Sequence, residues 1–160
     1  RDPYDWVLAR ARFFLSDTFK GQMDPLKGGA VSVEEVLNMM IFGIYDKAPS
    51  MRDIFVHNAA AWLGTQARML KMEELLSAVR NLDSPEAEGY FAETLGFLGI
   101  GSLPDDWRER VRVGSDRRQS GTARENLAGP ANDVPAELPA MQKRLVDFAI
   151  PGLRELLGYA

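Results

Sequence analysis

Hydrophobic residues recur every three or four positions along most of this chain, which is the spacing of amphipathic helices. In the first stretch, from about residue 3 to residue 20, one apolar face is made by Val7, Leu8, Ala11, Phe14, Leu15 and Phe19. Asp2 stands where it can cap this helix, and Pro3 takes the first helical position, where its missing N–H costs nothing. Strand-like alternation is almost absent, with Arg110–Val113 as one short exception. The pattern therefore predicts an all-α protein.

Two helix-start signals divide the middle of the chain. Residues 32–35, Ser-Val-Glu-Glu, form a capping box, in which the serine and the last glutamate satisfy backbone amides at a helix start. Ser50 and Asp53 repeat this arrangement with the same spacing. From this second start the apolar period continues to about residue 82, so we expect one long helix that Gly64-Thr65 kinks or splits.

The second half contains shorter helices and one stretch of different composition. Start and stop signals predict helices over about residues 84–98 and 103–112. Between residues 114 and 137, Ser, Gly, Asp, Pro, Asn and Arg dominate, so we expect a flexible Arg-containing loop or linker. The apolar period resumes in residues 138–160, a C-terminal helical segment that would pack on the bundle or on a partner. The chain is thus predicted to be a helical bundle of five to seven helices, with residues 1–113 as its core.

Composition narrows the function classes. The length of 160 residues is enough for one domain with a real core, and a net charge of -4 argues against broad electrostatic capture of nucleic acid or anionic membrane. The absence of cysteine excludes disulfides and thiolate zinc sites, and we predict no metal site and no cofactor. The longest apolar run, Met39–Tyr45, is far shorter than the roughly 20 residues that cross a bilayer. We therefore expect no membrane insertion and a cytoplasmic location.

The strongest candidate chemistry lies in Arg52-Asp-Ile-Phe-Val-His57, which contains the single histidine of the sequence. Imidazole titrates near neutral pH, and guanidinium makes forked contacts with phosphate. An arginine, a polar residue, three variable residues and a histidine resemble the signature of the HEPN superfamily, small all-helical proteins that include ribonuclease toxins. The resemblance implies a metal-independent endoribonuclease whose cleft forms between two subunits, with Arg52 on phosphate, His57 as acid or base and Asp53 orienting the pair. A capped helix start explains the same residues without catalysis, so both interpretations stay open.

A second candidate is a cluster of arginines in an otherwise acidic chain. Its members are Arg108, Arg110, Arg112, Arg117 and Arg118, with Arg124 beyond them. They could contact phosphate or the carboxylates of a partner. The competing interpretation is a solvated loop, because Glu109 and Asp116 dilute the cluster and no aromatic residues interleave residues 114–124 for base stacking.

The leading hypothesis is a non-catalytic helical protein–protein interaction domain, or one subunit of a larger assembly. It rests on many apolar helix faces and few convergent polar groups. Because the chain opens with Arg1 rather than methionine, we also expect the numbering to begin inside a longer product or after processing. The expected partner is a protein, nucleic acid enters only as the RNA substrate of the alternative, and a homo-oligomer is compatible with both.

Overall fold

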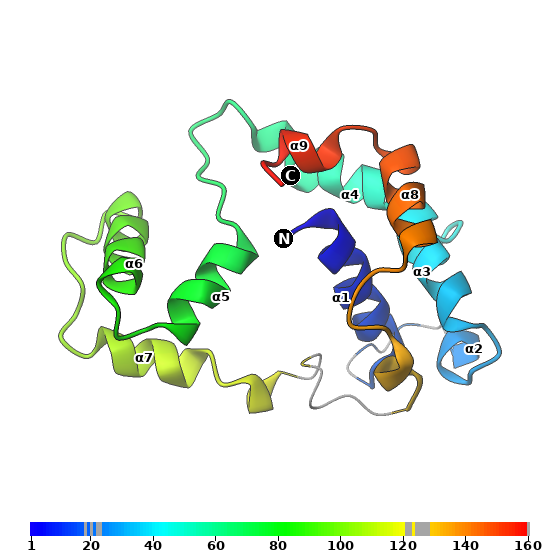
Figure 1. The fold of residues 1–160 in the computed structure, drawn as a ribbon, viewed down its shortest axis with the longest axis horizontal. Helices are drawn as coiled ribbons and strands as arrows, with labels where there is room; N and C mark the ends of the chain where they lie inside the picture. Colours follow the sequence, from blue (N-terminus) through cyan, green and yellow to red (C-terminus); the bar gives the residue numbers. More distant parts are fainter. Residues whose placement is uncertain (18, 20, 22–23, 121–122, 124–128, 160) are drawn as a thin grey trace. The chain divides into compact units, whose positions relative to one another are not determined.

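The structure is a computed structural model, which describes residues 1–17, 19, 21, 24–120, 123 and 129–159. Within these residues it contains nine α-helices and no strand, so the all-α prediction is confirmed (Figure 1). The chain divides into two compact units, which we call the large unit (Arg1–Met69 and Ser120–Ala160) and the small unit (Leu70–Gln119). None of the helices in the described ranges combines the length and apolar character needed to span a bilayer.

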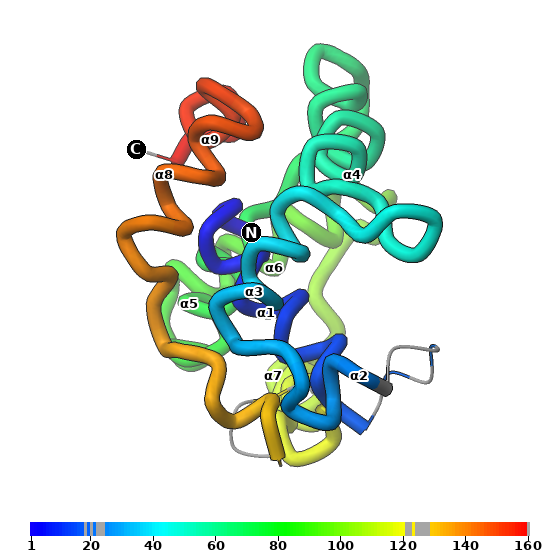
Figure 2. The backbone as a smooth tube through the Cα atoms, turned by 90° about the vertical axis from the view of Figure 1, so that its right-hand side faces the viewer, coloured from blue at the N-terminus to red at the C-terminus, as the bar shows by residue number. Residues whose placement is uncertain are grey.

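The large unit is built around its first helix. Its helices are α1 (Pro3–Leu15), α2 (Asp24–Lys27), α3 (Val33–Phe42), α4 (Met51–Asn58), α8 (Ala140–Ala149) and α9 (Leu153–Leu156). Helix α1 contacts α2, α3, α8 and the short 3-10 helix η4 (Gly129–Asp133), and α8 packs on α3. Figure 2 shows α9 beside α8 at the C-terminal end of the chain. The fully buried core side chains include Val7, Leu8, Ala11, Leu37, Met40, Met51, Val134 and Val146.

Helix starts in the structure follow the predicted caps. The Asp2 carboxylate accepts from the amide of Tyr4, and the Ser32 hydroxyl accepts from the amide of Glu35. Ser50 caps α4 in the same way as Ser32 caps α3, and both capping boxes are complete. These contacts span two or three residues, which is why the sequence predicts them.

The predicted split of the helix over residues 51–82 at Gly64-Thr65 is confirmed, but the break is longer than expected and extends from residue 59 to residue 71. Helix α4 ends at Asn58, a 3-10 turn follows at Ala60–Trp62, and α5 begins only at Met72. The Thr65 hydroxyl donates to the carbonyl of Trp62 at 2.7 Å and accepts from the amide of Ala67 at 3.1 Å. Such local side-chain bonds offer the backbone an alternative to helical bonds, and Gly64 has φ +75° beside them.

The small unit consists of three helices, α5 (Met72–Arg80), α6 (Pro85–Phe97) and α7 (Trp107–Gly114), followed by the 3-10 turn Arg117–Gln119. Helices α5 and α6 pack together, and the ring of Trp107 lies 5.3 Å from that of Phe91. The structure describes every residue of this unit, and its buried hydrophobic side chains are Ala78, Leu82, Ala87 and Trp107. Two of these four are alanines, so the core is thin.

The predicted flexible loop at 114–137 lies partly outside the described residues, at positions 121–122 and 124–128. Its described part includes η4, whose Ala131 is completely buried in the core of the large unit. The two units divide the chain at positions other than 113 and 137, and those predicted domain boundaries stay a prediction.

Candidate functional site

The Arg52–His57 segment forms most of helix α4. Arg52, Asp53 and His57 are all exposed. The Asp53 carboxylate accepts from the amide and the hydroxyl of Ser50, at 3.2 and 2.7 Å. Nδ1 of His57 lies 2.7 Å from the carbonyl oxygen of Asp53, and because a carbonyl can only accept, this ring nitrogen carries the proton. The Asp53 carboxylate is thus occupied by the helix cap, and only its backbone oxygen orients the imidazole.

Helical geometry keeps Arg52 and His57 apart within one chain. Five residues along a helix correspond to a rotation of about 140°, so the two side chains leave α4 in different directions. Nδ1 of His57 makes the contact with the Asp53 carbonyl oxygen, and Nε2, the other ring nitrogen, takes no part in it. A shared phosphate site would therefore require a second copy, as the HEPN resemblance implies.

The capping contacts have a measurable electrostatic consequence. Hydrogen bonds from Ser50 lower the pKa of Asp53, with smaller contributions from the charges of His57 and Arg52, and Ser32 lowers the pKa of Glu35 in the same way. Because each folded pKa lies below its unfolded value, each cap stabilises the fold above the unfolded pKa and loses this contribution as the pH falls through the folded pKa.

We expect Ser50→Ala to raise the pKa of Asp53 towards its ordinary value, because the substitution removes the hydroxyl that donates to the carboxylate. A carboxyl-detected NMR titration measures this shift. Ser32→Ala is the matched control, since it should move the pKa of Glu35 and leave that of Asp53 unchanged. An Asp53 titration unaffected by Ser50→Ala would contradict the capping contact.

The predicted arginine cluster is largely paired within the small unit. Arg110 binds Asp106 at 2.8 Å, and Arg118 binds Asp116 at 2.8 Å. The guanidinium of Arg112 lies 3.0 Å from Asp83. Arg108 pairs with Glu88 and stacks over the ring of Trp107, 4.5 Å from its centre. These four arginines therefore neutralise neighbouring carboxylates, and binding of an external ligand by the cluster stays a prediction.

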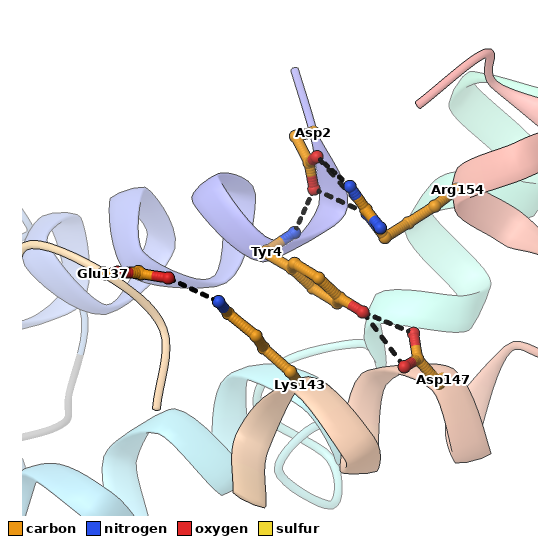
Figure 3. Close-up of polar contacts among 6 residues, drawn as sticks. All are labelled: Asp2, Tyr4, Glu137, Lys143, Asp147 and Arg154. Carbon is orange, nitrogen blue, oxygen red and sulfur yellow. Dashed lines mark hydrogen bonds and ion pairs between the residues drawn. The ribbon is translucent and has the colours of Figure 1, made fainter. Parts of the chain in front are cut away.

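A second polar cluster ties α1 to the C-terminal helices of the large unit. Figure 3 shows Arg154 reaching Asp2 while the Tyr4 hydroxyl points to Asp147. The guanidinium of Arg154 lies 3.0 Å from the Asp2 carboxylate and 4.3 Å from the centre of the Tyr4 ring. Tyr4 donates to Asp147 at 2.8 Å, and burial together with this carboxylate raises the pKa of Tyr4. Lys143 and Glu137 pair nearby. The charged and polar groups of this cluster pair with one another, so the cluster stabilises the packing of α1 against the C-terminal helices.

An apolar groove on the small unit is the feature that sequence reasoning missed. It is lined by Leu75, Leu76, Val79, Arg80, Phe91, Val111, Gly114, Ser115 and Arg117, and its volume is about 390 Å³. The five large apolar side chains of this apolar groove are only half-buried. The sequence does show the apolar spacing of residues 75, 76 and 79. Because the prediction placed these positions in one long helix over residues 51–82, it did not identify a separate apolar face on α5.

The apolar groove carries positive charge in an acidic unit. Residues 70–119 contain seven Lys and Arg against ten Asp and Glu, yet the residues that line the groove include two arginines and no acidic side chain. Arg80 is exposed in the last turn of α5, and Arg117 is exposed beyond the end of α7. The groove therefore combines apolar contact with a preference for anions.

Metal chemistry and known relatives add no further constraint. Among the residues with described positions, no three His, Asp or Glu side chains gather as a metal ion would require. Comparisons with protein-family models, with curated proteins and with solved structures find no match to the chain. The apolar groove and the exposed α4 segment are two candidate sites for a function.

Proposed function

We propose that this chain is a non-catalytic helical protein–protein interaction domain, which binds its partner through the apolar groove. One observation carries the proposal: five large apolar side chains from α5, α6 and α7 line an open groove, and none of them is fully buried. Large apolar side chains gathered in one concavity typically mark a binding surface, whereas single exposed ones do not.

The chemistry of the groove favours binding over catalysis. Its titratable side chains are Arg80 and Arg117, and guanidinium groups stay protonated in proteins. They cannot act as general acid or base at ordinary pH, because that role needs a pKa near the working pH. The lack of cysteine is compatible with a cytoplasmic setting, which forms part of this proposal.

A photo-cross-linking experiment tests the groove as a binding surface. A benzophenone amino acid replaces Leu76 in the full chain, and cross-linked partners are identified by mass spectrometry in cells that express it. We expect one recurring protein, which the purified wild-type chain then binds and which Leu76→Glu binds at least 10-fold more weakly, because a buried unpaired carboxylate opposes docking.

Ala92→Glu provides the matched control for this experiment. It adds the same charge to the same unit at an exposed position of α6 that does not line the groove, so partner binding should persist. Equal binding by Leu76→Glu and the wild type would contradict the proposal. Cross-links that join position 76 only to its own chain would contradict it as well.

A HEPN-like endoribonuclease is the second candidate, favoured by the exposure of Arg52 and His57 and by Nε2 of His57, which takes no part in the contact with Asp53. It would act on RNA as a homo-oligomer. Because the two side chains diverge within one chain, we expect incubation with labelled RNA to give no cleavage that depends on His57, as measured on denaturing gels. Cleavage that disappears in both His57→Ala and Arg52→Ala, with unchanged circular dichroism, would establish the nuclease instead.

A further inference from the structure

We propose that the occupant of the apolar groove is an amphipathic helix whose apolar stripe is flanked by acidic residues. This inference rests on the proposed function and specifies the partner's chemistry. Its first support is the geometry of α5, where Leu75, Leu76 and Val79 line the groove along one side of the helix. Residues three and four positions apart, such as 76 and 79 or 75 and 79, lie side by side on a helix, and the ridge that they form packs into a groove of a neighbouring helix.

The number of helices in the small unit gives the second support. Three helices, α5, α6 and α7, surround a thin core, and their apolar side chains at positions 75, 76, 79, 91 and 111 remain half-buried. A fourth amphipathic helix would cover these side chains and complete a four-helix arrangement, which is a common way to close an all-α core. Helix α5 has nine residues and is about 13 Å long, so about two and a half turns of a partner helix can lie along it.

Charge complementarity sets the composition of that partner. Arg80 and Arg117 line the groove, and none of the other lining residues carries a carboxylate. Arg80 makes no ion pair within the described part of the chain, and its guanidinium can form two parallel hydrogen bonds with one carboxylate. An occupant with Glu or Asp beside its apolar stripe is therefore preferred over one with Lys or Arg.

Selection from a peptide library tests this composition. Helical peptides with one randomised face are displayed on phage and selected on the full 160-residue chain, with counter-selection on Leu76→Glu to remove binders of other surfaces. We expect the selected sequences to carry Leu, Met or Phe at helical spacing with Glu or Asp enriched at the flanks. In fluorescence anisotropy, replacing these acids by Gln should weaken binding about fivefold, and less so at high salt.

Charge reversal at the groove gives the decisive comparison. Selection on Arg80→Glu should replace the flanking acids by Lys or Arg, whereas Arg144→Glu should leave the acids in place. Arg144 is the matched control, because it is exposed on α8 of the large unit, and its reversal changes the net charge by the same amount. Thermal melts followed by circular dichroism confirm that both variants keep the fold.

The outcomes separate this inference from the proposed function. Helices selected without an acidic preference, or with a preference that Arg80→Glu leaves unchanged, would overturn the acidic partner and leave the groove as an interaction surface. Selection of no helix would overturn the inference too, while photo-cross-linking at position 76 still decides the proposed function. If decanoate binds the wild type but not Leu76→Glu and no helix is selected, the occupant is an amphiphilic anion, and the inference fails.

Discussion

Replacing Arg10 by methionine is expected to destabilise the large unit by about 3 kcal/mol. Arg10 is only 8% exposed, although it carries a full charge. Its Nη1 donates to the carbonyl of Met40 at 3.0 Å, and its Nη2 donates to the carbonyl of Pro49 at 2.8 Å. Methionine fills a similar volume but leaves both carbonyl oxygens without this donor. Hydrogen exchange of amides in α1 and α3 measures the loss, because it reports the opening of the large unit separately.

The environment explains how a buried guanidinium is tolerated there. The Met40 carbonyl belongs to the last turn of α3, where carbonyls lack helical partners and carry partial negative charge. The Arg10 guanidinium also lies 5.0 Å from the centre of the Trp6 ring and 5.4 Å from that of Phe14. Burial lowers the pKa of Arg10, since the charged form loses water, but an arginine still stays protonated.

Two further substitutions separate the hydrogen bonds of Arg10 from its charge. Arg10→Lys keeps the charge but replaces the fork by one ammonium group, so its effect should fall between those of the wild type and Arg10→Met. Arg144→Met removes an exposed arginine and should change stability by less than about 0.5 kcal/mol. An Arg10→Met protein as stable as Arg144→Met would show that the two carbonyl contacts contribute nothing.

Arg10 also shows where prediction from the sequence ends. The capping serines and the apolar faces of α1 and α3 were predictable, because each depends on residues at most a few positions apart. The partners of Arg10 lie 30 and 39 residues away, so no local pattern identifies them. A lone arginine between apolar positions is typical of a solvated face, and only the tertiary fold reverses that expectation.

The candidate site divides in the same way. The sequence located Arg52, Asp53 and His57 on one helix, because their spacing and the Ser50 cap are local. It could not foresee the partners of Arg108 and Arg112, because Arg108 meets Glu88 and Arg112 meets Asp83 across 20 and 29 positions. The apolar stripe of α5 was visible, but whether another element covers it depends on how α6 and α7 pack.

We expect Gly43→Ala to lower the free energy of unfolding of the large unit by about 3 kcal/mol, for two reasons that both concern the added Cβ. Gly43 ends α3 with φ +84°, a conformation that side chains rarely adopt. A Cβ at this position would lie 2.8 Å from the carbonyl oxygen of Ala48 and 2.8 Å from the amide nitrogen of Ser50. Both neighbours are backbone atoms of the turn that Arg10 also holds through Pro49, so neither can move aside cheaply.

Gly29→Ala separates backbone strain from collision in this prediction. Gly29 has φ +72°, but a Cβ added to it meets nothing within 4 Å, so we expect the free energy of unfolding to fall by only about 1 kcal/mol. Gly89→Ala lies inside α6 with open space around it and should stabilise the small unit by about 0.5 to 1 kcal/mol. Hydrogen exchange resolved by unit measures all three changes. If Gly43→Ala and Gly29→Ala lowered the stability equally, the turn before α4 would accommodate an added methyl group. The backbone atoms of Ala48 and Ser50 would then not hold this turn in place.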